Sequence, residues 1–165
     1  MARRVKETGQ ESGAAPLPPA LAAWFAARGW APHPHQIAML AAARAGRSAL
    51  LIAPTGAGKT LAGFLGSLAA LSDDASPRLH TLYVSPLKAL AADIARNLTA
   101  PVAGMGLSVT VETRTGDTGA EARRRQRTKP PHILLTTPES LALLLSLPEA
   151  GTMFGGLEAI VVDEI

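Results

Sequence analysis

The stretch that decides the fold runs from residue 49 to residue 60 and reads ALLIAPTGAGKT. An apolar run passes into a glycine-rich turn, and a Lys-Thr pair then opens an Ala/Leu-rich segment. Loops that hold phosphate groups follow the pattern G-x-x-x-x-G-K-[ST], and residues 58–60 fit its second half. Ala53 stands where the pattern has its first glycine, and a methyl group is acceptable there if the backbone is still extended. We therefore predict a phosphate-binding loop between a strand and a helix.

Apolar, β-branched runs alternate with runs of helical period along the rest of the chain. Strands that are apolar throughout are typical of a parallel sheet with helices on both faces. We expect strands at 48–53, 80–85, 107–113, 132–137 and 159–164. We expect helices at 18–29, 33–46, 59–71, 87–98, 119–127 and 139–147, the first two ended by Gly29 and Gly46. Trp24, Phe25 and Trp30 are expected in the core, with stacking of Trp30 on a base as the alternative.

The bulk composition fits one globular domain. The chain has 165 residues, of which 47% are hydrophobic and 18% charged, and it has no cysteine. We expect a flexible N-terminal tail at 1–16 and one domain at 17–165. No apolar run approaches the ~18 residues of a membrane span, and the basic start is not followed by an apolar stretch, so we expect a cytoplasmic protein without a membrane partner.

Basic residues gather in one short run, although the formal net charge is only +3. The run consists of Arg123, Arg124, Arg125, Arg127 and Lys129. We interpret it as the solvated face of a helix, because charge runs usually are. Attraction to a nucleic-acid backbone is the alternative.

Three junctions between a strand and a helix are built alike. The phosphate loop is the first, Ser85-Pro86 is the second and Thr137-Pro138 is the third. We expect each hydroxyl residue to be the N-cap and each proline to take the first helical position. Helix N-termini attract anions, so an edge that carries three of them suggests a surface that meets several phosphates.

The last predicted strand ends in two acids, Asp163 and Glu164. A phosphate loop that hydrolyses its nucleotide needs an aspartate for magnesium and a second acid that activates water. General-base assistance of that kind contributes about 10²–10⁴-fold to a rate. Paired with the loop, the two acids favour hydrolysis over phosphate transfer to a small molecule.

Together these motifs resemble the first RecA-like domain of a superfamily 2 helicase. The loop with alanine first is similar to the helicase form, and DE followed by Ile resembles a DExH box without its His. SPLKAL resembles motif Ia, RTGDT and TTPESL resemble motifs Ib and Ic, and PHPHQIAML resembles the adenine-reading Q motif. The stretches LHTLYVSPLKALAADIARNL and VETRTGDT…ILLTTPESLALLL are similar to the Lhr (large helicase-related) family. WFAARGW followed by HQIAML most resembles the bacterial branch of that family, which is found with DNA ligase genes. The likeness covers about residues 20–165.

The resemblance implies the fold and a role for each matched residue. The fold would be the three-layer sheet of P-loop NTPases. Gln36 would read adenine, Thr60 and Asp163 would hold Mg²⁺, and Glu164 would be the general base. ATP phosphates would be held by Thr55, Gly56, Ala57, Gly58, Lys59 and Thr60. The DNA track would be lined by Ser85, Pro86, Leu87, Lys88, Arg114, Thr115, Gly116, Thr137, Pro138 and Glu139.

The resemblance also implies partners. Family members move 3′ to 5′ on single-stranded DNA, so the expected partner is single-stranded or partly duplex DNA, with a possible link to ligase and nuclease repair proteins. RNA stays an alternative, because the motifs contact the backbone. A module that binds nucleotide and nucleic acid without catalysis is a rival of another class.

The sequence stops at residue 165, before the motif III strand and the second RecA-like domain with its arginine finger. In RecA-like sheets the motif III strand lies between the strands that carry Lys59 and Asp163. We therefore expect a gap between these two strands. Residues 1–165 alone are expected to be poorly stable or to aggregate, with at most residual ATPase activity and no unwinding.

Overall fold

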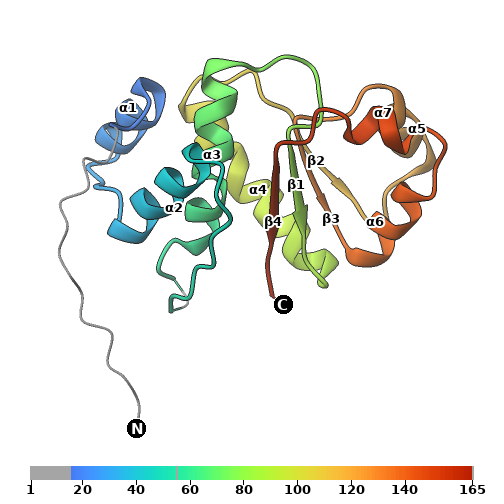
Figure 1. Ribbon diagram of the computed structural model, residues 1–165, viewed down its shortest axis with the longest axis horizontal. Coiled ribbons are helices and arrows are strands. Elements are labelled where there is room, and N and C mark those ends of the chain that lie inside the picture. Colours follow the sequence, from blue (N-terminus) through green and yellow to red (C-terminus); the bar gives the residue numbers. More distant parts are fainter. Residues whose placement is uncertain (1–15, 55, 165) are drawn as a thin grey trace, which may run out of the picture.

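A parallel sheet of four strands forms the centre of the molecule (Figure 1). The computed structural model describes residues 16–54 and 56–164. The strands are β1 (Thr81–Val84), β2 (Val111–Arg114), β3 (Ile133–Thr136) and β4 (Ala159–Val162). Their order across the sheet is β2-β3-β1-β4, and every neighbouring pair is parallel. This confirms the predicted α/β class.

Helices surround the sheet at nearly all the predicted places. They are α1 (Pro19–Ala27), α2 (Pro34–Arg44), α3 (Lys59–Asp73), α4 (Lys88–Gly104), α5 (Ala120–Thr128), α6 (Pro138–Leu145) and α7 (Ala150–Phe154). Helix α4 continues past the expected end at residue 98, and the short α7 was not predicted. Gly29 and Gly46 follow α1 and α2 with φ of +64° and +63°, which confirms the two expected helix ends.

The two faces of the sheet carry separate apolar clusters, as a covered parallel sheet requires. Tyr83 of β1 packs in the larger cluster with residues of α1 to α4. Its neighbour Leu82 points to the other face and packs with Leu144 of α6 and Met153 of α7. Successive strand residues point to opposite faces, so the strands hold the two helical layers apart.

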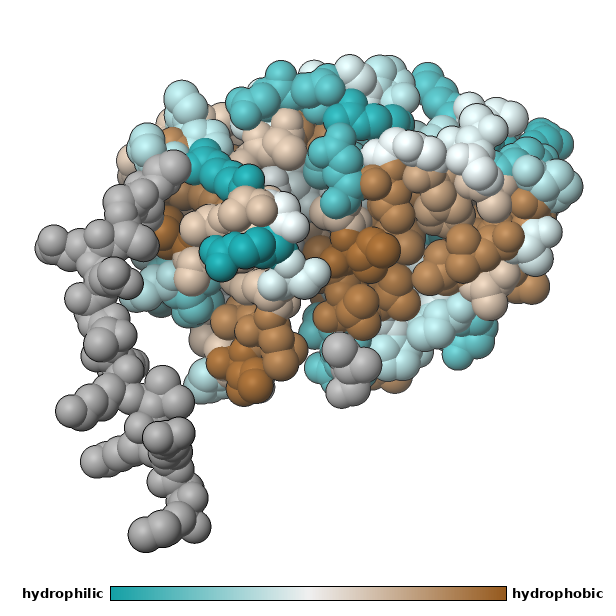
Figure 2. All heavy atoms as spheres, viewed as in Figure 1, coloured by the Kyte–Doolittle hydropathy of each residue, from teal (hydrophilic) through white to brown (hydrophobic). Residues whose placement is uncertain are grey.

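The predicted strand at 48–53 is wrong, because the segment has no strand structure. Leu50 and Ile52 are 79% and 87% exposed. A cavity of about 660 Å³ lies between this segment and β4, which is the last strand on that side of the sheet. A strand exists only through pairing with a neighbour, and no described strand pairs with this segment. Figure 2 shows hydrophobic surface gathered beside β4.

Ser85 is not an N-cap, which corrects a second prediction. Its backbone N–H donates to the Thr136 carbonyl at 3.1 Å, so the residue still belongs to the hydrogen-bonded sheet. The chain needs two more residues to turn, and α4 begins only at Lys88 with Leu87 as N-cap. At the junction between β3 and α6 the corresponding prediction is confirmed, because α6 begins at Pro138 and Thr137 is its N-cap.

Trp30 is 57% exposed, so its assignment to the core was wrong. Trp24 and Phe25 are buried as expected. The difference arises at Gly29, whose left-handed backbone ends α1 and carries the next side chain away from the buried face of that helix. The edge of Trp30 still contacts the Trp24 ring, with centroids 5.8 Å apart.

The N-terminal prediction lies almost entirely outside the described residues, because only Pro16 of the expected tail is included. No helix within the described ranges is long and apolar enough to cross a membrane.

Candidate functional site

The glycine-rich loop leads directly into α3. Gly58 is the N-cap of the helix and has a φ of +72°, and Gly56 has a φ of +81°. A Cβ atom at Gly58 would lie 2.8 Å from the Gln36 side-chain nitrogen. This position therefore needs glycine for its backbone angle and for space. Ala57 lies between the two glycines, and Thr55 lies outside the described residues.

The Lys59 side chain folds back over the loop. Its ammonium group donates to the Ala53 carbonyl oxygen at 2.8 Å. This contact keeps the charge beside the backbone N–H groups of the loop, where it adds to the positive end of α3. Such a combination attracts anions, and phosphate above all.

Gln36 ties the beginning of α2 to the same loop. Its side-chain oxygen accepts from the His33 backbone N–H at 2.9 Å, and its side-chain nitrogen lies 3.4 Å from the Gly58 carbonyl oxygen. The residue is only 3% exposed, so its amide group is buried between α2 and the loop. Any movement of α2 would therefore be felt at the phosphate loop.

A second cavity, of about 740 Å³, opens beside Gln36 and the loop. Its apolar wall comes from Trp24, Phe25 and Trp30, and Arg28 lies 4.3 Å above the centre of the Trp24 ring. Aromatic and guanidinium planes beside a phosphate loop suit a flat heterocyclic base. Thr60 lines this cavity and also the cavity of about 660 Å³ beside β4, so the two meet at the beginning of α3.

Asp163 lies at the carboxyl end of β4, where its backbone N–H continues the pairing with β1. One carboxylate oxygen accepts from the Tyr83 hydroxyl at 3.0 Å. Burial and this hydrogen bond together raise the pKa of Tyr83. Lys59, Thr60 and Asp163 line the same cavity of about 660 Å³. The structure thus brings the loop lysine and the strand aspartate together.

Glu164 is exposed and does not line that cavity. Its backbone N–H donates to the other Asp163 oxygen at 3.0 Å. Its φ of +59° lies in the left-handed region, which a residue other than glycine seldom adopts.

The other predicted motifs lie at the carboxyl ends of the remaining strands, hence on one edge of the sheet. Lys88, at the start of α4, forms an ion pair of 2.8 Å with Asp117 in the loop after β2. Thr136 donates to the Arg114 carbonyl oxygen at 2.7 Å, which joins the ends of β3 and β2. Hydrogen bonds at the start of α6, from the Glu139 backbone first and then Thr137, lower the pKa of Glu139. The residues expected to form a track are therefore neighbours.

Arg114 is placed differently from the other track residues. Its guanidinium group points to α5, donating to the Arg123 carbonyl oxygen at 2.9 Å and to the Gln126 side chain at 3.3 Å. Burial lowers the pKa of Arg114.

Sequence reasoning missed Arg123 and Gln126, because the whole run was interpreted as a solvated face. Gln126 is buried and Arg123 is partly buried, whereas Arg124 and Arg125 are exposed. The interpretation as a solvated helix face is therefore wrong for the side of α5 that carries Arg123 and Gln126. The signal was available: an uncharged glutamine lies three residues after Arg123, on the same side of a helix.

Comparisons with known proteins agree with this arrangement. The family model described as DEAD/DEAH box helicase matches residues 33–165. The protein named Lhr helicase/probable uracil glycosylase from Mycolicibacterium smegmatis is 43% identical over 155 residues, which are 86% of this chain and 10% of the relative.

Two solved structures share the fold. The Mycobacterium smegmatis helicase Lhr bound to ssDNA and AMP-PNP superposes with a TM-score of 0.82 and 39% identity, over 88% of this chain and 20% of that one. The DUF1998 helicase MrfA bound to DNA and AMPPNP has a TM-score of 0.80 and 31% identity, over 90% of this chain and 21% of that one.

The chain thus spans between a tenth and about a fifth of the length of these relatives. The match of fold, motifs and family model covers both the phosphate loop and the acids after β4. The chain belongs to the DEAD/DEAH box helicase family, with the RecA-like fold of a helicase domain and with Lhr helicases among its relatives.

Proposed function

We propose that the chain is the ATP-binding part of an ATP-dependent DNA helicase or translocase. The observation that carries the proposal is the cavity shared by Lys59, Thr60 and Asp163, beside a glycine loop that leads into a helix. Two relatives of this fold hold an ATP analogue and DNA, which supports the same pair of ligands here.

ATP would lie along the loop. Lys59 would contact its outer phosphates, Gln36 would read its adenine, and residues 55–60 would supply backbone N–H groups. The Thr60 hydroxyl and the Asp163 carboxylate are hard oxygen donors of the kind that Mg²⁺ prefers. Mg²⁺ supplies charge neutralisation at the phosphates when it is bound. Glu164 would accept the proton of the water that attacks the terminal phosphorus, while the bond from that phosphorus to ADP breaks.

Single-stranded or partly duplex DNA would cross the edge formed by residues 85–88, 114–116 and 137–139. Their contacts would go to phosphates, so binding would depend little on base sequence. Movement from 3′ to 5′ and work in DNA repair beside ligase and nuclease proteins, in the cytoplasm, belong to this proposal. So does a second RecA-like domain of the same polypeptide, which would complete the site.

The test uses the chain extended to the full length of its relatives. Lys59→Ala should nearly abolish ATP hydrolysis, because the phosphates lose their counter-charge. Glu164→Gln should keep binding of AMP-PNP and lose turnover, because an amide cannot accept the proton. Lys129→Ala, which also removes one exposed lysine, is the control and should hydrolyse ATP normally.

Phosphate release is measured without nucleic acid, with single-stranded DNA and with single-stranded RNA. Stimulation by DNA alone supports the proposal, and stimulation by RNA alone replaces it with an RNA-acting enzyme. Normal turnover in Glu164→Gln would refute the general-base role. Binding of both ligands without turnover in the unaltered protein would favour a non-catalytic module.

A further inference from the structure

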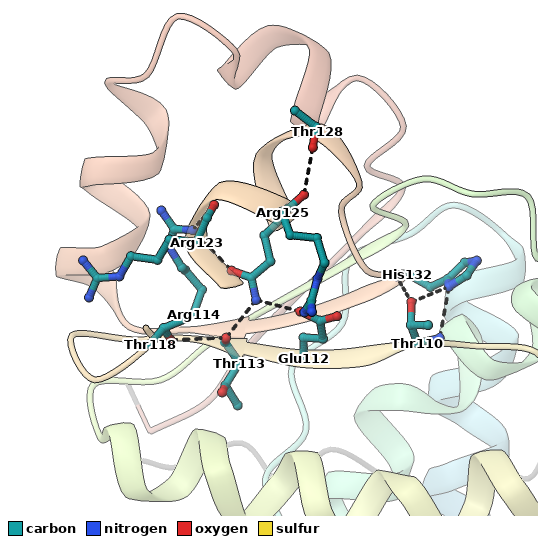
Figure 3. A network of polar contacts seen from close by, with 10 residues as sticks. Thr110, Glu112, Thr113, Arg114, Thr118, Arg123, Arg125, Thr128 and His132 are labelled. Atoms are coloured by element: carbon teal, nitrogen blue, oxygen red, sulfur yellow. Dashed lines mark hydrogen bonds and ion pairs between the residues drawn. The ribbon is translucent and has the colours of Figure 1, made fainter. Parts of the chain in front are cut away.

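A side chain of α5 holds the loop that follows β2, and Figure 3 shows the polar contacts that join α5 to β2. Arg123 donates through one guanidinium nitrogen to two successive carbonyl oxygens of this loop, at 3.2 Å to Thr115 and 2.6 Å to Gly116. Both acceptors belong to the segment proposed to meet nucleic acid. A single planar cation thus fixes the direction of two peptide groups.

The backbone of Arg123 is itself fixed. Its carbonyl oxygen accepts from Arg114 at the end of β2, and Arg114 also contacts Gln126. The buried Gln126 amide nitrogen donates to the Glu112 carboxylate at 2.8 Å and to the Thr113 carbonyl oxygen at 3.1 Å. Arg125 closes the network through an ion pair of 2.7 Å with Glu112. Helix α5 and strand β2 therefore form one braced unit.

The loop at residues 115–118 also contacts Lys88 at the start of α4. Thr118 accepts from the Thr115 backbone N–H at 2.9 Å, and Asp117 between them forms the ion pair with Lys88. Both members of that pair are well exposed, and an exposed pair contributes only about 0–1 kcal/mol. Such a weak contact cannot place the loop. Hydrogen bonds around Thr115 and Thr118 shape the turn itself, and Arg123 joins this turn to α5.

We propose that Arg123 is a positioning residue for nucleic-acid binding, a role that rests on the proposed function. It holds residues 115–118 so that their backbone and Lys88 face the same strand of nucleic acid. The guanidinium group of Arg123 donates to carbonyl oxygens of the loop. Arg123 therefore acts on nucleic-acid binding through the position of the loop and does not itself contact a phosphate.

The competing explanation is that Arg123 contributes only charge, as any arginine of the run would. Arg124 is the matched control, since it is the next residue on the same helix and is exposed. Its side chain has no hydrogen bond or ion pair with another residue of the described ranges. Lysine at either position keeps the charge, but its side chain is shorter and more flexible and its ammonium group is more strongly hydrated, so it holds two carbonyl groups less firmly than the rigid guanidinium group does.

The experiment compares Arg123→Lys, Arg124→Lys, Arg123→Met and Arg124→Met in the chain extended to the length of its relatives. Binding of a fluorescent single-stranded oligonucleotide is measured at several salt concentrations, beside the affinity for AMP-PNP and the unfolding temperature. Arg123→Met should weaken binding of the oligonucleotide about tenfold, the cost of one lost charge-assisted interaction. Arg123→Lys should weaken it several-fold, and Arg124→Lys should not. The affinity for AMP-PNP should stay unchanged in all four.

Equal oligonucleotide affinities of Arg123→Lys and Arg124→Lys would overturn the proposal, and this pair decides the matter even if Arg123→Met fails to fold. A parallel loss of AMP-PNP binding in Arg123→Lys would overturn it too, because the residue would then support the fold in general. Lys88→Ala separates the two levels. If it weakens binding while Arg123→Lys does not, only the positioning role fails, whereas no effect of Lys88→Ala means that the track itself is wrong.

Discussion

Trp30 shows how much a single exposed side chain adds to the nucleotide cavity. Its ring lines the cavity of about 740 Å³ together with Arg28 and Gln36. We predict that Trp30→Ala weakens binding of ATP analogues up to about tenfold, since aromatic stacking contributes about 0.5–1.5 kcal/mol. Titration calorimetry with AMP-PNP measures the change. Leu143→Ala removes another exposed apolar side chain, from α6, and is the control. Unchanged affinity in Trp30→Ala would mean that the base lies elsewhere.

His80 is a residue whose titration should be felt in stability. Burial lowers the pKa of His80, and the opposing effect of Glu158 is smaller. Its Nδ1 lies 2.7 Å from the Thr81 hydroxyl, which is itself buried. An unfolded histidine has a pKa of about 6.5, so the unfolded chain takes up a proton first as the pH falls. The stability contribution is complete above that pH and is lost below it.

We therefore predict that the unfolding temperature drops between about pH 7 and pH 5. Part of this drop should disappear in His80→Gln, because the lowered pKa of His80 is one of its causes. Thermal denaturation followed by circular dichroism across this range checks the difference. An identical pH profile for His80→Gln and the unaltered chain would contradict the assignment.

At the scale of elements, the contact between α2 and α3 sets the two halves of the nucleotide site. Gln36 stands near the start of α2, and Lys59 opens α3. A Cβ atom at Gly66 would lie 2.5 Å from the Ala43 Cβ, which is too close for two carbon atoms that are not bonded to each other. The glycine is thus the residue that lets the helices approach.

We predict that Gly66→Ala destabilises the chain, because overpacking costs about 1–3 kcal/mol and outweighs the roughly 0.5–1 kcal/mol that alanine gains in a helix. It should also weaken binding of AMP-PNP, since α2 carries Gln36. Gly151→Ala in α7 meets no atom within 4 Å and should be neutral or stabilising. Urea denaturation of both variants decides. A more stable Gly66→Ala would show that the helices separate freely.

Strands β1, β3 and β4 and most helices could be predicted from the sequence, because apolar runs and caps are local signals. Thr137-Pro138 is such a signal, and it was interpreted correctly. The segment at 48–53 has the same apolar pattern, but no described strand pairs with it. A local pattern of residues does not reveal whether a pairing strand is present. The prediction of Ser85 as an N-cap was wrong for a related reason, because a backbone hydrogen bond to Thr136 of β3 keeps Ser85 in the sheet. The inward turn of Arg123 depends on β2, which the helical run itself does not reveal.

At the scale of the whole molecule, the open side of the sheet governs behaviour. Within the described part of the chain, strand β4 has a neighbour on one side only, and its Ile160 and Val162 are exposed. Leu50 and Ile52 face water across the cavity region. Unpaired strand edges with apolar side chains invite pairing with other chains.

We predict that the 165-residue chain by itself associates at micromolar concentrations. Light scattering coupled to size-exclusion chromatography should show mass rising with concentration. Ile160→Lys together with Val162→Lys should reduce that rise, because charge on an edge strand opposes pairing. As a control, Leu143→Lys together with Leu145→Lys changes two exposed apolar residues of α6. This variant should show the same rise of mass with concentration as the unaltered chain. A strictly monomeric chain would show that the open edge is harmless.

The contact between Tyr83 and Asp163 gives the chain a spectroscopic label of its own. Tyr83 is the single tyrosine of the sequence, its ring stacks on Phe64 with centroids 5.7 Å apart, and its hydroxyl donates to the aspartate. Any cation that draws on that carboxylate must alter the phenol's hydrogen bond. Ultraviolet resonance Raman bands of tyrosine would therefore report occupation of the nucleotide site directly, without a dye and without changing a residue.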